Sequence, residues 1–401
     1  MATKHLTVSC HCGIVTHTFP VPTSSLPLLS HLCSCDISRR ISGSLLTSYI
    51  NITHPTPLDP YPAKPDTSHC TAYKSSDILR RWFCTHCGTH MYLEYAGDGH
   101  FEAATGTVRV DREGDGIVRF ESCMWIGDTR DGGASVWVRE IGGRVVERWD
   151  GDAGGSEKLP HEDTDAQDAK DEDEIKIEIG PVHAHCHCHG VQFWITPPDN
   201  NSKDAASPFP DLMIPHYLSS SESANPDNKT WWLRTDGSKT KYLAGTCTCA
   251  SCRRVSGFDI TFWAFIPVSN IFLSPPLPSS DSSAAADSAT RATPFPPWPQ
   301  GSDFPTWGTM RTYASSPGVT RSFCSVCGAN IFWAGDAEYT GRKGVLDVAV
   351  GLLDARSGAR AEEMLRWWTE RVSFVEEGVH RGLCVELEGG LKEWGKGRKG
   401  E

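Results

Sequence analysis

The sequence carries the same set of cysteine motifs twice, in the same order. In the first half the motifs are Cys10-x-Cys12, Cys33-x-Cys35 and Cys84-x-x-Cys87. In the second half they are Cys186-x-Cys188, Cys247-x-Cys249-x-x-Cys252 and Cys324-x-x-Cys327. Closely spaced thiolates can converge on one soft divalent ion, and zinc is the usual one. The pattern therefore predicts two related modules, each built around metal.

The second copy holds seven such cysteines, and this number constrains the sites. Four thiolates close one tetrahedral zinc site. The remaining three would leave a second zinc with an open ligand position, which a catalytic zinc needs. With one closed site in the first copy, we expect about three zinc ions per chain.

Composition agrees with a metal protein of a reducing compartment. The chain has 401 residues and 16 cysteines, and its N-terminus MATKHLTVSC has no apolar run. Cysteines without an export signal favour metal ligands over disulfides. No stretch approaches the roughly 18 apolar residues of a membrane span. We expect a soluble, cytoplasmic protein without membrane contact, and the sequence does not exclude a nuclear location.

An acidic segment divides the two copies. Residues 151–178 hold eleven carboxylates against three lysines and have few large apolar side chains. Such a stretch buries too little surface to offset its ordering entropy, so a disordered linker over 151–179 is expected. It separates modules at 1–150 and 180–395. The acidity also argues against nucleic-acid binding.

The pattern of apolar residues is mostly that of strands. Runs such as 190–195, 258–266 and 345–353 are rich in β-formers, and no helical apolar period continues beyond two turns. The second module also has two insertions of loop composition, between Pro197 and Asn228 and between Ser274 and Pro305. We therefore expect a mainly β protein.

The ordered motifs resemble the glutathione-dependent formaldehyde-activating enzymes, a family also named with centromere protein V. That family has a Cys-x-Cys-Gly start, a central Cys-x-Cys-x-x-Cys-Arg-Arg and a Phe-Cys-x-x-Cys-Gly knuckle. The second module meets the pattern with its seven cysteines and with Arg253, Arg254, Phe323 and Gly328. It departs at one position, because His189 stands between the first Cys-x-Cys and Gly190, where the family usually has glycine directly. The first module meets it too, with Gly13, Arg39, Arg40, Phe83 and Gly88, but has Ser38 opposite Cys252.

The resemblance implies a β-tent fold, in which two antiparallel sheets splay around zinc. It also implies which cysteines share a metal. In each module, the first Cys-x-Cys and the last Cys-x-x-Cys would form a closed, structural site. These sites would be Cys10, Cys12, Cys84 and Cys87 in the first module, and Cys186, Cys188, Cys324 and Cys327 in the second. The central Cys247, Cys249 and Cys252 would hold the open, catalytic zinc. The matching Cys33 and Cys35 would form a degenerate site, because Ser38 is a poor zinc ligand.

The implied activity is carbon–sulfur lyase chemistry on glutathione adducts, such as formation of S-hydroxymethylglutathione from formaldehyde. The partners would be glutathione and a small aldehyde or thiol adduct. The alternative is a zinc-stabilised interaction scaffold without catalysis, in which His185, His187 or His189 supplies the fourth ligand of the second zinc.

The sequence permits two roles for a pair of adjacent arginines. Arg253, a candidate catalytic residue, and Arg254 would bind the glutathione carboxylates as bidentate partners, or would instead cap carbonyls and form structural salt bridges. The alternating histidines at 183, 185, 187 and 189 are expected to form a polar solvent face rather than a metal site.

Overall fold

The computed structural model describes residues 2–53, 63–110, 116–161, 180–218, 223–236, 239–276, 292–298 and 302–397. The elements of the first half are β1 (Thr3–Ser9), β2 (Thr16–Pro22), β3 (Leu28–Cys33), α1 (Asp36–Ser42), β4 (Tyr49–Asn51), β5 (Cys70–Lys74), β6 (Leu79–Cys84), β7 (His90–Tyr95), β8 (Phe101–Ala104), β9 (Val108–Arg109), β10 (Val118–Met124), β11 (Glu140–Ile141), β12 (Arg144–Val145), β13 (Glu147–Trp149) and β14 (Lys158–Leu159). Short 3-10 helices add η1 (Thr23–Ser25), η2 (Thr105–Thr107), η3 (Gly127–Thr129) and η4 (Gly133–Trp137).

The second half repeats this order of elements. They are β15 (Val182–His185), β16 (Gln192–Ile195), β17 (Leu233–Asp236), β18 (Lys239–Cys247), α4 (Ala250–Ser256), β19 (Thr261–Pro267), β20 (Ile271–Phe272), β21 (Met310–Ser316), β22 (Val319–Cys324), β23 (Asn330–Gly335), β24 (Val345–Ala349), β25 (Leu353–Asp354), β26 (Leu365–Trp367) and α5 (Arg381–Lys396). The 3-10 helices are η5 (Asn200–Lys203), η6 (Val268–Asn270), η8 (Val350–Leu352) and η9 (Val375–Glu377).

The sheets confirm the mainly β prediction. In the first half the strand orders are β2-β1-β9, β4-β8-β7-β6-β5 and β14-β13-β10-β3, with the small hairpin β11-β12. In the second half they are β20-β16-β15-β25 and the larger sheet β17-β18-β19-β24-β23-β22-β21. Most pairs are antiparallel, but β10 runs parallel to β3 and β13, and β26 runs parallel to β18. In both halves this parallel strand lies beside the strand that leads to the central cysteines.

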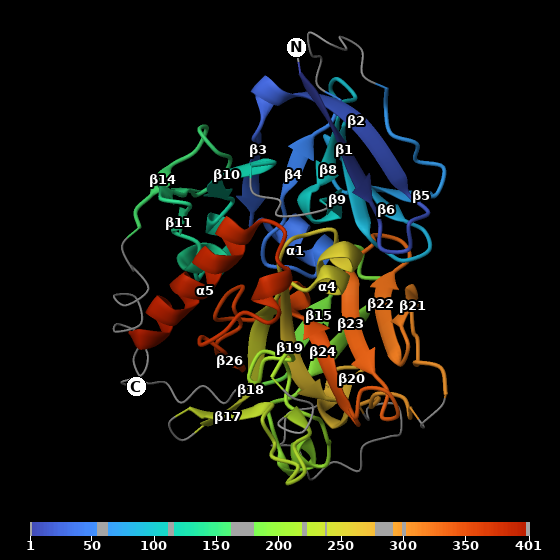
Figure 1. Ribbon diagram of the computed structural model, residues 1–401. Coiled ribbons are helices and arrows are strands. Elements are labelled where there is room, and N and C mark those ends of the chain that lie inside the picture. Colours follow the sequence, from blue (N-terminus) through green and yellow to red (C-terminus); the bar gives the residue numbers. More distant parts are fainter. Residues whose placement is uncertain are drawn as a thin grey trace.

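The two halves pack against each other around the helices α1 and α4, which lie near the centre of Figure 1. The contact is reciprocal. The Gly106 amide donates to the Gly257 carbonyl, and the Gly351 amide donates to the Gly43 carbonyl, both at 2.9 Å. Both helix-ending glycines have positive φ, +75° at Gly43 and +87° at Gly257. A Cβ at Gly257 would lie 2.2 Å from the His90 carbonyl oxygen, so the close approach itself requires glycine.

The core is also shared between the halves. One cluster of buried apolar side chains includes Val8 and Trp137 of the first half together with Phe262 and Leu391 of the second. The two halves of the chain therefore bury their apolar surface together.

The helix α5 is the main departure from the expected secondary structure. It has 16 residues, more than the two turns that the sequence predicted, and buries Leu383, Leu387 and Leu391. In Figure 1 it lies beside the first half, next to the region of β10 and β11. It packs on η4 so closely that a Cβ at Gly390 would lie 1.9 Å from the Trp137 carbonyl oxygen. Among the described residues, no helix is long and apolar enough to span a membrane.

The start of the predicted linker is ordered, which corrects the boundary at 151. Residues 151–161 fold back on the first half, where β14 pairs with β13 and the Lys158 ammonium contacts the Glu147 carboxylate at 2.7 Å. The Gly151 carbonyl accepts from the Trp125 amide at 2.7 Å. Neighbouring backbone offers these residues hydrogen bonds that composition does not reveal. The rest of the predicted linker, 162–179, lies outside the described residues.

Candidate metal centres and the cavity beside them

The eight cysteines predicted for the closed sites meet in two groups. They are Cys10, Cys12, Cys84 and Cys87, and Cys186, Cys188, Cys324 and Cys327, with sulfur atoms within 4.8 Å of one another in each group. Measured S···S distances include 3.4 Å for Cys10–Cys12 and 3.5 Å for Cys188–Cys324. A zinc tetrahedron with Zn–S bonds of about 2.3 Å needs S···S distances of about 3.8 Å, so both groups fit that ion.

The local backbone turns each Cys-x-Cys hairpin toward its metal position. The amides of Val15 and Val191 donate to Cys10 Sγ and Cys186 Sγ, both at 3.3 Å. The turn needs one residue with positive φ, which is Gly13 at +81° in the first half and His189 at +57° in the second. His189 thus takes the left-handed position that glycine takes in the first half, and the cysteine geometry is unchanged.

Cys247, Cys249 and Cys252 form a third group, with their sulfur atoms within 4.8 Å of one another. Cys247 ends β18, and Cys249 caps α4 by accepting the Cys252 amide on its sulfur at 3.2 Å. Among the described residues, no histidine or carboxylate joins this group. Three thiolates and no fourth protein ligand are the donor set of an open zinc site.

An arginine from β22 approaches this group. Arg321 is 4% exposed, and its Nη2 donates to Cys252 Sγ at 3.3 Å and to Ser251 Oγ at 3.1 Å. Hydrogen bonds from the Cys247 and Cys249 thiols, followed by the charge of Arg321, hold the pKa of Cys252 well below its usual value. The site therefore favours a thiolate at Cys252.

The first half keeps the frame of this site without its third thiol. Cys35 caps α1 by accepting the Ser38 amide on its sulfur at 3.3 Å, and Arg81 Nη2 donates to Ser38 Oγ at 3.1 Å. The Cys33 hydrogen bond, with smaller contributions from Ser38 and Arg81, lowers the pKa of Cys35 to about 6. A group of three possible ligands does not form here among the described residues.

A cavity of about 270 Å³ adjoins the three-cysteine group. Its floor is one face of the large sheet, because β-register places alternate residues of neighbouring strands on the same side. Cys247 pairs with Thr261, and Trp263 and Phe265 follow on that face of β19. Further lining residues are Arg321, Trp333, Arg342 and Asp347.

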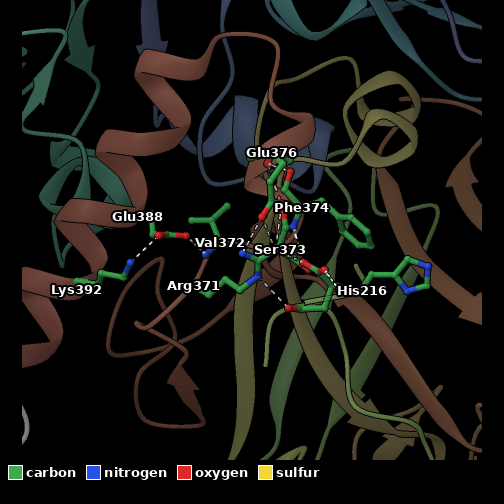
Figure 2. A network of polar contacts seen from close by, with 10 residues as sticks. His216, Arg371, Val372, Ser373, Phe374, Glu376, Glu388 and Lys392 are labelled. Carbon is green, nitrogen blue, oxygen red and sulfur yellow. Dashed lines mark hydrogen bonds and ion pairs between the residues drawn. The ribbon is translucent and has the colours of Figure 1, made fainter. Parts of the chain in front are cut away.

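The cover of the cavity comes from two segments that the sequence did not connect with the site. Pro210, Asp211 and Leu212 belong to the first insertion, and Ser373 and Phe374 follow β26. Figure 2 shows the polar contacts that fix residues 371–374. Asp211 Oδ1 accepts from the Phe374 amide at 2.6 Å, and Thr248 Oγ1 donates to the Phe374 carbonyl at 2.9 Å.

Sequence reasoning missed most of this cavity. The insertion 197–228 had only loop composition, and nothing in the sequence linked it to residues 371–374. One signal was available: Asp347 is the lone acid within the apolar run Val345–Leu353. A carboxylate in a buried strand is expected to have a partner or a function.

Arg253 and Arg254 lie at the contact between the halves. Arg253 Nη1 donates to the carbonyls of Gly106 and Val108, at 2.5 and 3.3 Å, and Arg254 Nη2 donates to the His11 carbonyl at 2.9 Å. The sequence left carboxylate binding and carbonyl capping open for this pair, and the observed contacts are of the second kind. Hydrogen bonds to charged groups contribute about 1.5–3 kcal/mol each, so the pair stabilises the contact substantially.

The alternating histidines divide between two environments. The His185 ring stacks on that of His189, with centroids 4.1 Å apart, and the His183 ring lies tilted against His185 at 4.9 Å. His187 instead contacts the first half, where Tyr73 Oη lies 2.7 Å from its Nδ1. None of them joins a possible metal group among the described residues.

Comparisons with known proteins agree with the cysteine pattern. No curated protein and no solved structure matches this chain. A family model described as glutathione-dependent formaldehyde-activating enzyme matches residues 5–115. That range contains all six of the first half's motif cysteines, and the second half repeats both the motifs and the strand order. The chain thus carries a domain of the glutathione-dependent formaldehyde-activating enzyme family at residues 5–115.

Proposed function

We propose that the second half is a zinc-dependent carbon–sulfur lyase that makes and breaks adducts between glutathione and a small aldehyde, with formaldehyde as the reference substrate. The observation that carries this proposal is the group Cys247, Cys249 and Cys252, which has no fourth protein ligand among the described residues and adjoins the 270 Å³ cavity. The family model at residues 5–115 supports glutathione chemistry for this fold.

Zinc bound by the three thiolates would supply an open position that takes a substrate thiol and lowers its pKa. The protein's own residues would do the rest. Arg321 holds Cys252 in place and offsets the negative charge of the thiolates. Trp263, Phe265 and Trp333 give the cavity apolar walls, which strengthen the electrostatic interactions inside it. Only the reacting end of a tripeptide thiol needs to enter such a space.

The proposal can be tested on the intact chain by metal counting and by a thiol challenge. Native mass spectrometry should find three zinc ions per chain. After replacement by Co²⁺, glutathione should change the visible d–d spectrum, because a fourth sulfur ligand completes the open site. The protein should also accelerate glutathione–formaldehyde exchange, followed by exchange NMR.

Two results would contradict the proposal. A count of two zinc ions in freshly purified, unchelated protein would remove the open site. A cobalt spectrum unchanged by millimolar glutathione, together with an uncatalysed exchange rate, would favour the zinc-stabilised scaffold. Both measurements should use a buffer that does not coordinate zinc or cobalt, so that no buffer molecule occupies the open ligand position.

A further inference from the structure

The cavity contains two carboxylates, and they differ in their surroundings. Asp347 lies on β24, opposite Phe265 of β19 and Trp333 of β23, and all three line the cavity. Asp211 lies in the cover. Among the described residues, no histidine, tyrosine or lysine lines the cavity, so these two acids are the candidates for moving a proton there.

Both carboxylate oxygens of Asp211 accept hydrogen bonds from residues around the cover. Its Oδ1 accepts from the Phe374 amide at 2.6 Å, from Arg371 Nη2 at 3.2 Å and from Ser373 Oγ at 3.3 Å. Its Oδ2 accepts from the His216 amide at 2.7 Å. Figure 2 shows how these donors converge from residues 371–374 and from His216. With both of its oxygens engaged by donors, Asp211 serves to hold the cover in place.

Asp347 has a simpler environment. Arg342 Nη1 contacts its Oδ1, and among the described residues no donor reaches Oδ2. Asp347 is 8% exposed, and burial raises the pKa of its carboxyl above the usual range, against the opposing charge of Arg342. Arg321 also acts to lower this pKa and Cys252 to raise it. The carboxyl therefore takes up a proton more readily than a free aspartate does.

Arg342 fixes the position of this carboxyl. Its guanidinium lies 4.5 Å from the ring centroid of Trp333 and 5.7 Å from that of Phe265. It is thus held between the aromatic walls of the cavity and the acid. Such stacking orients Asp347 while leaving Oδ2 for another contact.

We propose that Asp347 is the proton-transfer group of the lyase site, an inference that rests on the function proposed above. In adduct formation the thiol S–H proton passes to Asp347 Oδ2. The sulfur then forms the new S–C bond to the aldehyde carbon as the C=O π bond breaks. Asp347 returns the proton to the resulting oxygen, giving the S–CH₂–OH adduct. Cleavage follows the reverse course, so no oxidant, reductant or further reactant is needed.

The first half offers an internal comparison for this role. Glu102 of β8 occupies the matching strand position, but there Tyr95 Oη donates to its Oε2 at 3.5 Å and His100 Nε2 lies 3.9 Å from Oε1. The first half therefore has an acid at this strand position although it lacks the third thiol. Asp347 differs in facing a cavity beside a complete three-cysteine group.

The test is Asp347→Asn in the zinc-loaded, full-length chain. Asparagine keeps the shape and can still accept from Arg342, but it cannot carry the proton. We expect kcat for glutathione–formaldehyde exchange to fall by about 10²-fold, because general acid–base catalysis typically contributes 10²–10⁴-fold. The acid limb of the pH profile should disappear, whereas the glutathione-induced change in the Co²⁺ spectrum should keep its midpoint. Asp347→Glu should recover part of kcat and restore the acid limb.

The matched control is Glu338→Gln, which removes an exposed carboxylate from the loop before β24 and should leave kcat and pH profile unchanged. A second measurement needs no turnover: calorimetry in buffers of different ionisation enthalpy should show fewer protons released per bound thiol in the wild type than in Asp347→Asn. Equal proton release, or an Asp347→Asn variant with wild-type kcat and its acid limb, overturns this inference alone. A wild type that neither binds glutathione nor accelerates exchange overturns the proposed function and this inference together.

Discussion

The two central cysteine sites of this chain share a frame and differ in one ligand. In both halves the middle cysteine caps a seven-residue helix, and an arginine from β6 or β22 reaches the residue at the third ligand position. That residue is Ser38 in one half and Cys252 in the other. The first half adopts the frame with a serine at this position, so the fold does not require a third thiol there. This difference supports the chemical role proposed above for Cys252.

The cover of the site is the second difference between the halves. In the second half an insertion contributes Asp211 and Leu212 to the cavity wall. In the first half the corresponding connection between β2 and β3 is only the short segment 23–27, which contains η1. The halves thus differ in both a ligand and a wall, and the second half has both.

The sharpest way to break this comparison is to remove one thiol from each site. Cys247→Ser should reduce glutathione–formaldehyde exchange to the uncatalysed rate, because two thiolates hold zinc too weakly at an open site. Cys33→Ser should leave kcat within about twofold of wild type, as expected for a residue away from the active zinc. Exchange NMR on both variants measures the effect, and a large loss of activity in Cys33→Ser would mean that the first half also has a working site.

A gain of metal should follow from restoring the missing ligand. Ser38→Cys completes a three-cysteine group with Cys33 and Cys35 in a frame that already exists. Native mass spectrometry should then count four zinc ions per chain in place of three. Ser38→Ala is the matched control and should keep the count at three. A count that stays at three in Ser38→Cys would show that the frame alone does not determine metal binding.

The smallest expected effect concerns the continuity of the chain. A specific protease site placed within 162–179 should yield two fragments that elute together in size-exclusion chromatography. The reciprocal glycine and arginine contacts and α5 hold the halves together without the connecting segment. Exchange activity should stay within about twofold of the uncut protein, since no catalytic contact is cut. Fragments that separate in low-salt buffer would instead show that the shared core depends on a covalent connection.

The sequence predicted the ligand sets better than it predicted their surroundings. Metal ligands come in fixed, short spacings, so the individual cysteine motifs and the defect at Ser38 were visible in the sequence, whereas the family resemblance implied which motifs share a metal. The helix α5 was missed although Leu383, Leu387 and Leu391 follow a spacing of four, because Gly389 and Gly390 interrupt the pattern. Gly390 is there for its close approach to Trp137, a tertiary contact that propensity does not encode.

The cavity was unpredictable for a related reason. Its floor depends on the register of β24 between β23 and the distant strand β19, and its cover depends on a hydrogen bond between Asp211 and residue 374. Neither leaves a local signature. The roles of Arg253 and Arg254 were also undecided by sequence, since carboxylates and carbonyls attract guanidinium groups alike.

The reciprocal contact at Gly43 and Gly257 has a consequence for the history of such a chain. Each half presents the surface against which the other half's helix packs. A protein that consisted of the second half alone would therefore expose a large apolar face. After duplication, selection can relax on the ligand at position 38 while it still acts on the glycine five residues later. Under the function proposed above, the first half would then persist for the surface that it offers to the second half rather than for catalysis.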